Sequence, residues 1–129
     1  MNNNVNFEIA KLLKEKEYDE PCHNAYDTHG MQFANGWLDY LWENGNEIPF
    51  TKKDLKPQDT LAPTIAQVVM WLYEKHDIWI DVVLSRNEKQ FTFMIQSLNF
   101  DSNKFLNEYF NSPTQAYSAA ILYTLKNLI

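Results

Sequence analysis

Hydrophobic side chains recur with helical spacing between residues 62 and 76. They stand at i, i+3, i+4 and i+7, in the order Ile65, Val68, Val69 and Leu72. This spacing places them on one face and predicts an amphipathic helix. Pro63 suits the first turn of that helix, where a backbone N–H has no intrahelical partner.

The spacing changes to strict alternation after Asp77. Apolar residues at every second position predict a half-buried strand over residues 78–84, and the alternation returns over residues 91–97 after a polar turn. The two segments predict a β-hairpin that shares a core with the preceding helix. We therefore expect Leu72 and Ile80 to be buried side by side in one interior.

Two further helices are predicted near the ends of the chain. Asn6 can cap a helix over residues 6–16. A second helix begins with a capping-box pattern, Ser112-Pro-Thr-Gln115, and its apolar stripe consists of Tyr117, Ile121, Leu125 and Leu128. The predicted fold class is α+β, with a small, mainly antiparallel sheet. A helix–strand–strand–helix core carries that sheet, and the N-terminal helix closes the core.

The segment between residues 18 and 60 has a weaker pattern. It predicts a short strand over residues 22–26, a turn over residues 27–30, and a partner strand that contains Met31, Phe33 and Trp37. Asn35-Gly36 is itself a strong turn signal, and the aromatic residues 37–42 fit either a strand or a helical turn. The pattern assigns no structure to residues 30–58 as a whole.

Composition narrows the class of protein. A chain of 129 residues, 45% of them hydrophobic, is expected to form one globular domain. No apolar run approaches the ~20 residues of a membrane span, so no membrane partner is expected. The N-terminus lacks the basic and apolar regions of a signal peptide, and one cysteine cannot form an internal disulfide. These features favour a reducing cytoplasm.

Charge and glycine content argue against phosphate ligands. Residues 15–59 hold ten acidic side chains against four lysines, which accounts for the whole net charge of −6. The negative electrostatic field of this segment disfavours contact with nucleic-acid backbones. Three glycines form neither a dinucleotide fingerprint nor a P-loop, so no cofactor is expected.

One cluster carries side chains that are capable of chemistry: Cys22, His23, Asp27 and His29. A thiolate with an imidazole and a carboxylate can act as a nucleophile, and one sulfur with two ring nitrogens can ligate zinc. The spacing matches neither kind of site, and sequence neighbours on a strand point to opposite sides. A buried cysteine beside a polar turn is the stronger interpretation. No catalytic or metal-binding residue is therefore assigned.

A second candidate is an interaction surface. It consists of apolar side chains that lie off the main stripe of the helix or on the outward side of the following strand: Met70, Trp71, Tyr73 and Trp79. A helix that is apolar over most of its circumference is either covered on two sides or forms an interface. Burial under the aromatic-rich residues 31–50 is the stronger interpretation of these side chains.

The chain resembles small phage and prophage proteins of gut bacteria. The shared features lie at residues 6–14, 18–22, 62–69, 71–76, 78–80, 112–114 and 123–129. The pattern of helices and strands is also similar to phage domains that form an alpha-beta-alpha sandwich. The resemblance implies a viral or prophage origin and an α+β fold, but it implies no activity and no site.

Three functions follow as hypotheses. The first is a non-enzymatic accessory protein of a phage or prophage that binds a protein partner or a second copy of itself. The second is a small thiol enzyme or hydrolase that uses Cys22 with His23 or His29. The third is an acidic decoy for a nucleic-acid-binding protein, which requires the carboxylates of residues 15–59 to lie in a row.

Overall fold

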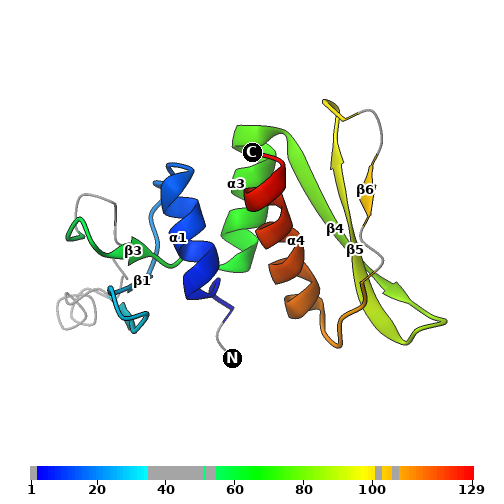
Figure 1. The fold of residues 1–129 in the computed structure, drawn as a ribbon, viewed down its shortest axis with the longest axis horizontal. Helices are drawn as coiled ribbons and strands as arrows, with labels where there is room; N and C mark the ends of the chain where they lie inside the picture. The colour runs from blue at the N-terminus through cyan, green and yellow to red at the C-terminus, as the bar shows by residue number, and fades with distance from the viewer. Residues whose placement is uncertain (1–2, 35–50, 52–54, 101–102, 106–107) are drawn as a thin grey trace, which may run out of the picture. The chain divides into compact units, whose positions relative to one another are not determined.

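The computed structural model describes residues 3–34, 51, 55–100, 103–105 and 108–129. Helices and antiparallel strands occur together, which confirms the predicted α+β fold class. The described elements are, in chain order, α1 (Phe7–Glu15), β1 (Asn24–Tyr26), β2 (Gln32–Ala34), β3 (Thr60–Leu61), α3 (Ile65–His76), β4 (Ile78–Ser85), β5 (Gln90–Ser97), β6 (Lys104–Phe105) and α4 (Pro113–Asn127) (Figure 1).

Contacts along the backbone group the chain into two units, residues 2–64 and residues 65–129. Each unit has its own three-stranded sheet, so the described residues form two sheets rather than the single sheet predicted. The second sheet contains the short strand predicted within residues 22–26 and its predicted partner, and β3 adds a strand that the sequence pattern did not predict. That all 129 residues form one domain stays a prediction.

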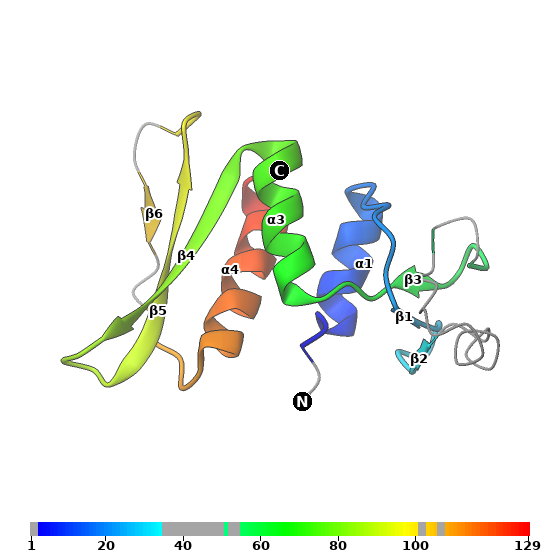
Figure 2. The same ribbon diagram turned by 180° about the vertical axis from the view of Figure 1, so that it is seen from behind.

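The unit of residues 65–129 contains the predicted hairpin. Strands β4 and β5 pair without a bulge from Ile78 opposite Ser97 to Ser85 opposite Gln90, and β6 adds a third antiparallel strand in the order β4-β5-β6. Helices α3 and α4 both lie on one side of this sheet (Figures 1 and 2). The inward side chains Ile80, Phe93 and Ile95 are almost completely buried, as the alternating pattern requires.

Helix α4 begins as its capping box predicts. The Ser112 hydroxyl accepts the Gln115 N–H at 3.2 Å, and Pro113 occupies the first turn. The Gln115 side-chain carbonyl accepts the N–H of Asn111, one residue before the expected partner. The buried face includes small residues that the apolar stripe omitted: Ala116, Ala120 and Thr124 lie beside Ile121 and Leu125.

Helix α3 begins three residues later than predicted. Pro63 lies before the helix, because residues 4 and 64 form an antiparallel bridge and the Val5 N–H donates to the Pro63 carbonyl at 2.9 Å. This pairing holds the chain extended up to Thr64. At its other end the helix stops at His76, and Asp77 takes a left-handed conformation with φ 55°.

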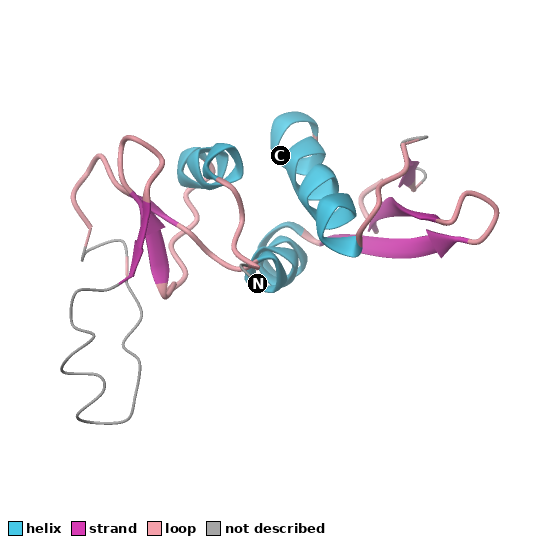
Figure 3. Cartoon of the chain, turned by 90° about the horizontal axis from the view of Figure 1, so that it is seen from below, coloured by secondary structure: helices cyan, strands magenta, loops and turns pink. Residues whose placement is uncertain are grey.

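The unit of residues 2–64 consists of α1 and the sheet β2-β1-β3 (Figure 3). The Asn6 side chain caps α1 by accepting the Ile9 N–H at 2.9 Å, as predicted. The helix ends in a Schellman motif, in which Glu17 is left-handed and the Tyr18 N–H donates to the Leu13 carbonyl at 2.9 Å. A turn at residues 27–30 joins β1 to β2, as the sequence predicts, with Gly30 at φ 79°.

Several predictions fall on residues outside the described ranges. They are the pairing of Trp37, the turn at Asn35-Gly36, the structure of residues 37–42, and the covering of α3 by the aromatic residues of 31–50. The closure of the hairpin core by the N-terminal helix also stays a prediction. Within its own unit, α1 contacts β3.

Candidate functional site

The aromatic patch is the cluster of exposed apolar side chains at the junction of α3 and β4. It consists of Met70, Tyr73 and Trp79, which are 45%, 53% and 41% exposed. The Tyr73 and Trp79 rings meet edge to face, with centroids 5.6 Å apart and planes at 81°. Such a geometry stabilises an aromatic pair beyond the area it buries, so the two rings hold each other in place at the surface.

The sharp turn at Asp77 brings these two rings together. The Asp77 N–H donates to the Tyr73 carbonyl at 3.2 Å, which closes the last turn of α3. The left-handed backbone of Asp77 then directs the chain into β4. Tyr73 and Trp79 are six positions apart. Neither a continuous helix nor a continuous strand brings side chains at that spacing into contact. The patch therefore depends on the helix end as much as on the residue types.

Trp71 belongs to a different environment from the rest of the predicted surface. Its side chain is 5% exposed, and its ring meets that of His76 at 4.8 Å and 70°. We therefore remove Trp71 from the predicted interface. The helical pattern misplaces it because α3 buries five residues over a wide arc, not the four-residue stripe alone.

The outer face of the β4–β5 sheet continues the patch. Trp79, Asp81 and Val83 point to the side away from the buried Ile80, because side chains alternate along a strand. Val83 and Leu84, near the hairpin tip, are 43% and 57% exposed. The sequence pattern marks these residues only as strand positions. Val83 lies on the outer face, whereas Leu84 lies on the same face as Ile80, so the exposure of Leu84 means that the helices do not cover the hairpin tip.

The cysteine cluster has a structural role. Cys22 is completely buried, and its Sγ donates to the Glu20 carbonyl at 3.3 Å and lies 4.0 Å from the Tyr18 hydroxyl. Burial in this apolar environment, with a smaller contribution from the Glu20 charge, raises the pKa of the Cys22 thiol to about 11. A thiol that stays protonated at neutral pH is a poor nucleophile and a poor metal ligand.

The other residues of that cluster are His23, which precedes β1, and Asp27 and His29, which lie in the β1–β2 turn. The Asp27 carboxylate accepts the backbone N–H groups of His29 and Met31 at 2.8 and 2.9 Å. These two hydrogen bonds, of which the one from Met31 has the larger effect, hold the pKa of Asp27 below its ordinary value. His23 and His29 are exposed. Among the described residues, no three His, Cys, Asp or Glu side chains are placed to hold a metal ion.

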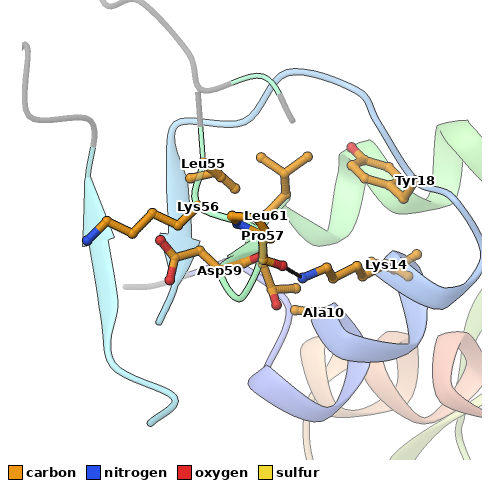
Figure 4. A pocket seen from close by; sticks show the side chains of 10 residues that line it. Ala10, Lys14, Tyr18, Leu55, Lys56, Pro57, Asp59 and Leu61 are labelled. Carbon is orange, nitrogen blue, oxygen red and sulfur yellow. Dashed lines mark hydrogen bonds between the residues drawn. The ribbon is translucent and has the colours of Figure 1, made fainter. Parts of the chain in front are cut away.

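A cavity of about 280 Å³ lies in the unit of residues 2–64, between the end of α1 and residues 55–61. Figure 4 shows the side chains that line it: Ala10, Lys14 and Tyr18 come from α1 and the residues just after it, and Leu55 and Leu61 from the segment before β3 and from β3. The Lys14 ammonium reaches across to the backbone carbonyls of Pro57 and Asp59, the latter at 3.0 Å. The sequence places Lys14 on the solvent side of its helix, so this contact over more than forty residues is not predictable from spacing.

This cavity is a weaker candidate than the aromatic patch. Its volume is just below that of typical ligand pockets, which enclose about 300–1,000 Å³. The Lys14 ammonium at its rim is already bound to the main-chain oxygens of Pro57 and Asp59. We interpret the Lys14 contacts as a clamp on the loop before β3.

Comparisons with family models, curated proteins and solved structures found no match. The function must therefore be argued from this chain's own surface. No helix in the described part of the chain is long and apolar enough to cross a membrane.

Proposed function

We propose that this chain is a non-enzymatic accessory protein of a phage or prophage that acts by binding another protein through the aromatic patch. One observation carries the proposal: Met70, Tyr73 and Trp79 are exposed apolar side chains, Met70 lies one helical turn before Tyr73, and the Tyr73 and Trp79 rings are in edge-to-face contact. Aromatic residues are enriched in interface centres because they bury a large area with few rotatable bonds. The origin rests on the resemblance of the chain to phage proteins.

The proposed compartment is the cytoplasm of the bacterial host. Cys22 is a free thiol, buried and hydrogen-bonded, with no cysteine to pair with in the chain. A reducing compartment keeps such a thiol in this form. The thiol-enzyme alternative requires the opposite environment, in which an exposed basic group lowers the thiol pKa. The geometry of Cys22 gives that alternative no support.

The acidic-decoy alternative depends on carboxylates between residues 15 and 59. Four of them, at positions 39, 43, 47 and 54, lie outside the described residues. Within the described residues, Asp27 is engaged by the turn it forms. No specific observation favours this function over the aromatic patch.

A quantitative pull-down from lysate of a bacterial host tests the proposal. The bait is the intact chain, compared with Trp79→Ser and with the control Leu98→Ser. Leu98 is fully exposed and lies outside the patch, so its replacement removes a similar apolar side chain without touching Tyr73. We expect a protein that the wild type and Leu98→Ser retain equally and that Trp79→Ser loses. Retention that is identical for all three baits would refute the aromatic patch as a binding surface.

A further inference from the structure

A carboxylate lies beside the exposed ring of Trp79 on the outer face of β4. Trp79 and Asp81 are two positions apart on one strand, so both side chains point away from the buried Ile80. Trp79 is 41% exposed and Asp81 is half-buried. Two residues of a strand span about 6.6 Å, so one ligand group can contact the indole ring and the carboxylate at the same time.

Two more carboxylates lie at the end of α3, close to Tyr73. Glu74 lies one turn after Met70 on the same face of the helix, and Asp77 lies at the turn into β4. Both acidic residues are exposed. Lys75 is two positions after Tyr73 and therefore projects from a different side of the helix. The aromatic patch thus has acidic side chains at its border on both α3 and β4.

The β4–β5 hairpin places no basic side chain next to Asp81. The residues of β5 that share its outer face are uncharged: Gln96, Met94 and Thr92. Lys104 of β6 lies opposite the buried Ile95, so it belongs to the inner side of the sheet. Arg86 and Lys89 lie in the turn at the far end of the hairpin. The negative charge beside Trp79 is therefore not cancelled by this sheet.

The acidic side chains at the border of the patch have no partner in the described part of the chain. No hydrogen bond or ion pair there engages the carboxylate of Glu74, Asp77 or Asp81. Interfaces between proteins bring surfaces of opposite charge together. An exposed aromatic pair bordered by three such carboxylates is therefore complementary to a basic group.

We propose that the aromatic patch recognises a basic segment of a different protein, with an arginine side chain stacked on Trp79 and bound to Asp81. A guanidinium is planar and stacks on an indole, within about 6 Å of the ring centroid. Its N–H groups also donate two parallel hydrogen bonds to a carboxylate. The spacing of Trp79 and Asp81 allows one arginine to form both contacts. This inference rests on the proposed function and deepens it by naming the chemistry of the partner.

A second copy of this chain is a poorer occupant of the patch. Each copy has a net charge of −6, so two copies repel each other. The single arginine of the chain, Arg86, lies in the hairpin turn together with Glu88. The same negative charge disfavours a nucleic acid. A basic segment of another protein is the occupant that charge complementarity favours.

Two matched peptides test the inference. The probe is a short fluorescein-labelled peptide with arginine at every second position and serine between. Its control has citrulline in place of each arginine, which keeps the shape of the side chain and removes the charge. In a fluorescence-anisotropy titration at low ionic strength, we expect the intact chain to bind the arginine peptide about tenfold more tightly than the citrulline peptide.

Two variants and a control assign this binding to the patch. Asp81→Asn removes the charge with little change of shape, and Trp79→Leu removes the ring but keeps an apolar side chain. We expect each variant to weaken binding of the arginine peptide about threefold. Glu88→Gln removes the same charge in the hairpin turn and should stay within about 1.5-fold of the wild type. The double variant should lose less than the product of the two single losses, because both groups contact one guanidinium.

Three results would overturn the inference. The first is equal affinity for the arginine and citrulline peptides. The second is a loss for Asp81→Asn that is no larger than the loss for Glu88→Gln, because charge would then act only at a distance. The third is a wild-type dimer in sedimentation velocity that Arg86→Gln abolishes, which would make a second copy the occupant. Far-UV circular dichroism checks the folding of each variant, and if Trp79→Leu does not fold, the comparison of Asp81→Asn with Glu88→Gln decides.

The inference and the proposed function fail in distinguishable ways. A lysate partner that Trp79→Ser loses and Asp81→Asn retains in full leaves the proposed function standing and overturns the basic ligand. Peptide binding that depends on both Trp79 and Asp81, without any lysate partner that depends on Trp79, supports the chemistry of the patch and overturns the proposed function alone.

Discussion

Replacement of Ile80 by alanine should destabilise the hairpin unit more than any substitution at its surface. Ile80 is 1% exposed, lies opposite the buried Ile95, and shares its face with Phe93. The change removes three carbon atoms, which is about 2.4 kcal/mol of lost transfer free energy. Its neighbours belong to hydrogen-bonded strands that cannot close the gap, so a cavity term is added. We expect the free energy of unfolding to fall by about 3–4 kcal/mol.

Urea denaturation followed by circular dichroism at 222 nm measures this loss. Leu72→Ala is the companion variant, because Leu72 is fully buried on α3 and should cost about 2–5 kcal/mol. Leu98→Ala is the control, because its side chain is fully exposed and its loss should change stability by less than about 0.5 kcal/mol. If Ile80→Ala behaves like Leu98→Ala, the alternation over residues 78–84 does not create the core described above.

Three further predictions concern the ends of elements and the buried thiol. Ser112→Ala removes the hydroxyl that accepts the Gln115 N–H and should lower the free energy of unfolding by about 1 kcal/mol in a urea titration. Lys89 has φ 55°, so Lys89→Gly should raise stability by roughly 0.5–1 kcal/mol, whereas Asn87→Gly should not. Folding raises the pKa of Cys22 from 9.0 to about 11, so the unfolded chain loses the thiol proton first as pH rises. Stability should therefore fall between pH 9 and 11 by an amount that Cys22→Ala does not show, and a flat difference between the two proteins would contradict the burial effect.

Local signals predicted most of the regular structure. The helix caps at Asn6 and Ser112 are where the residue types place them, because a cap is decided by a few neighbouring groups. The hairpin register follows from alternation over eight residues on each strand. These elements are long and regular enough for the local pattern to dominate.

The errors come from contacts between distant segments. The sequence predicts that the helix begins around Pro63. The Pro63 carbonyl instead accepts a hydrogen bond from the N–H of Val5, almost sixty residues earlier, and the helix begins after that contact. Trp71 lies beside the main stripe, so its spacing fits either an interface or burial under another segment, and the structure shows it buried. Spacing assigns a residue to a face of its own element. It does not say how much of that face other segments cover.

Strand β4 illustrates the same division between local and distant information. Alternation distinguishes the inner face from the outer face, so the sequence alone identifies Trp79 as an outward residue. Which residues of β4 direct their backbone groups away from β5 is decided by the hydrogen bonds between Phe91 and Phe110, on the far side of β5. Two of those residues, Ile78 and Ile80, are 3% and 1% exposed, so their backbone groups are covered as well as their side chains. Tertiary packing, which no local pattern records, therefore decides how much of the edge of β4 another chain can reach.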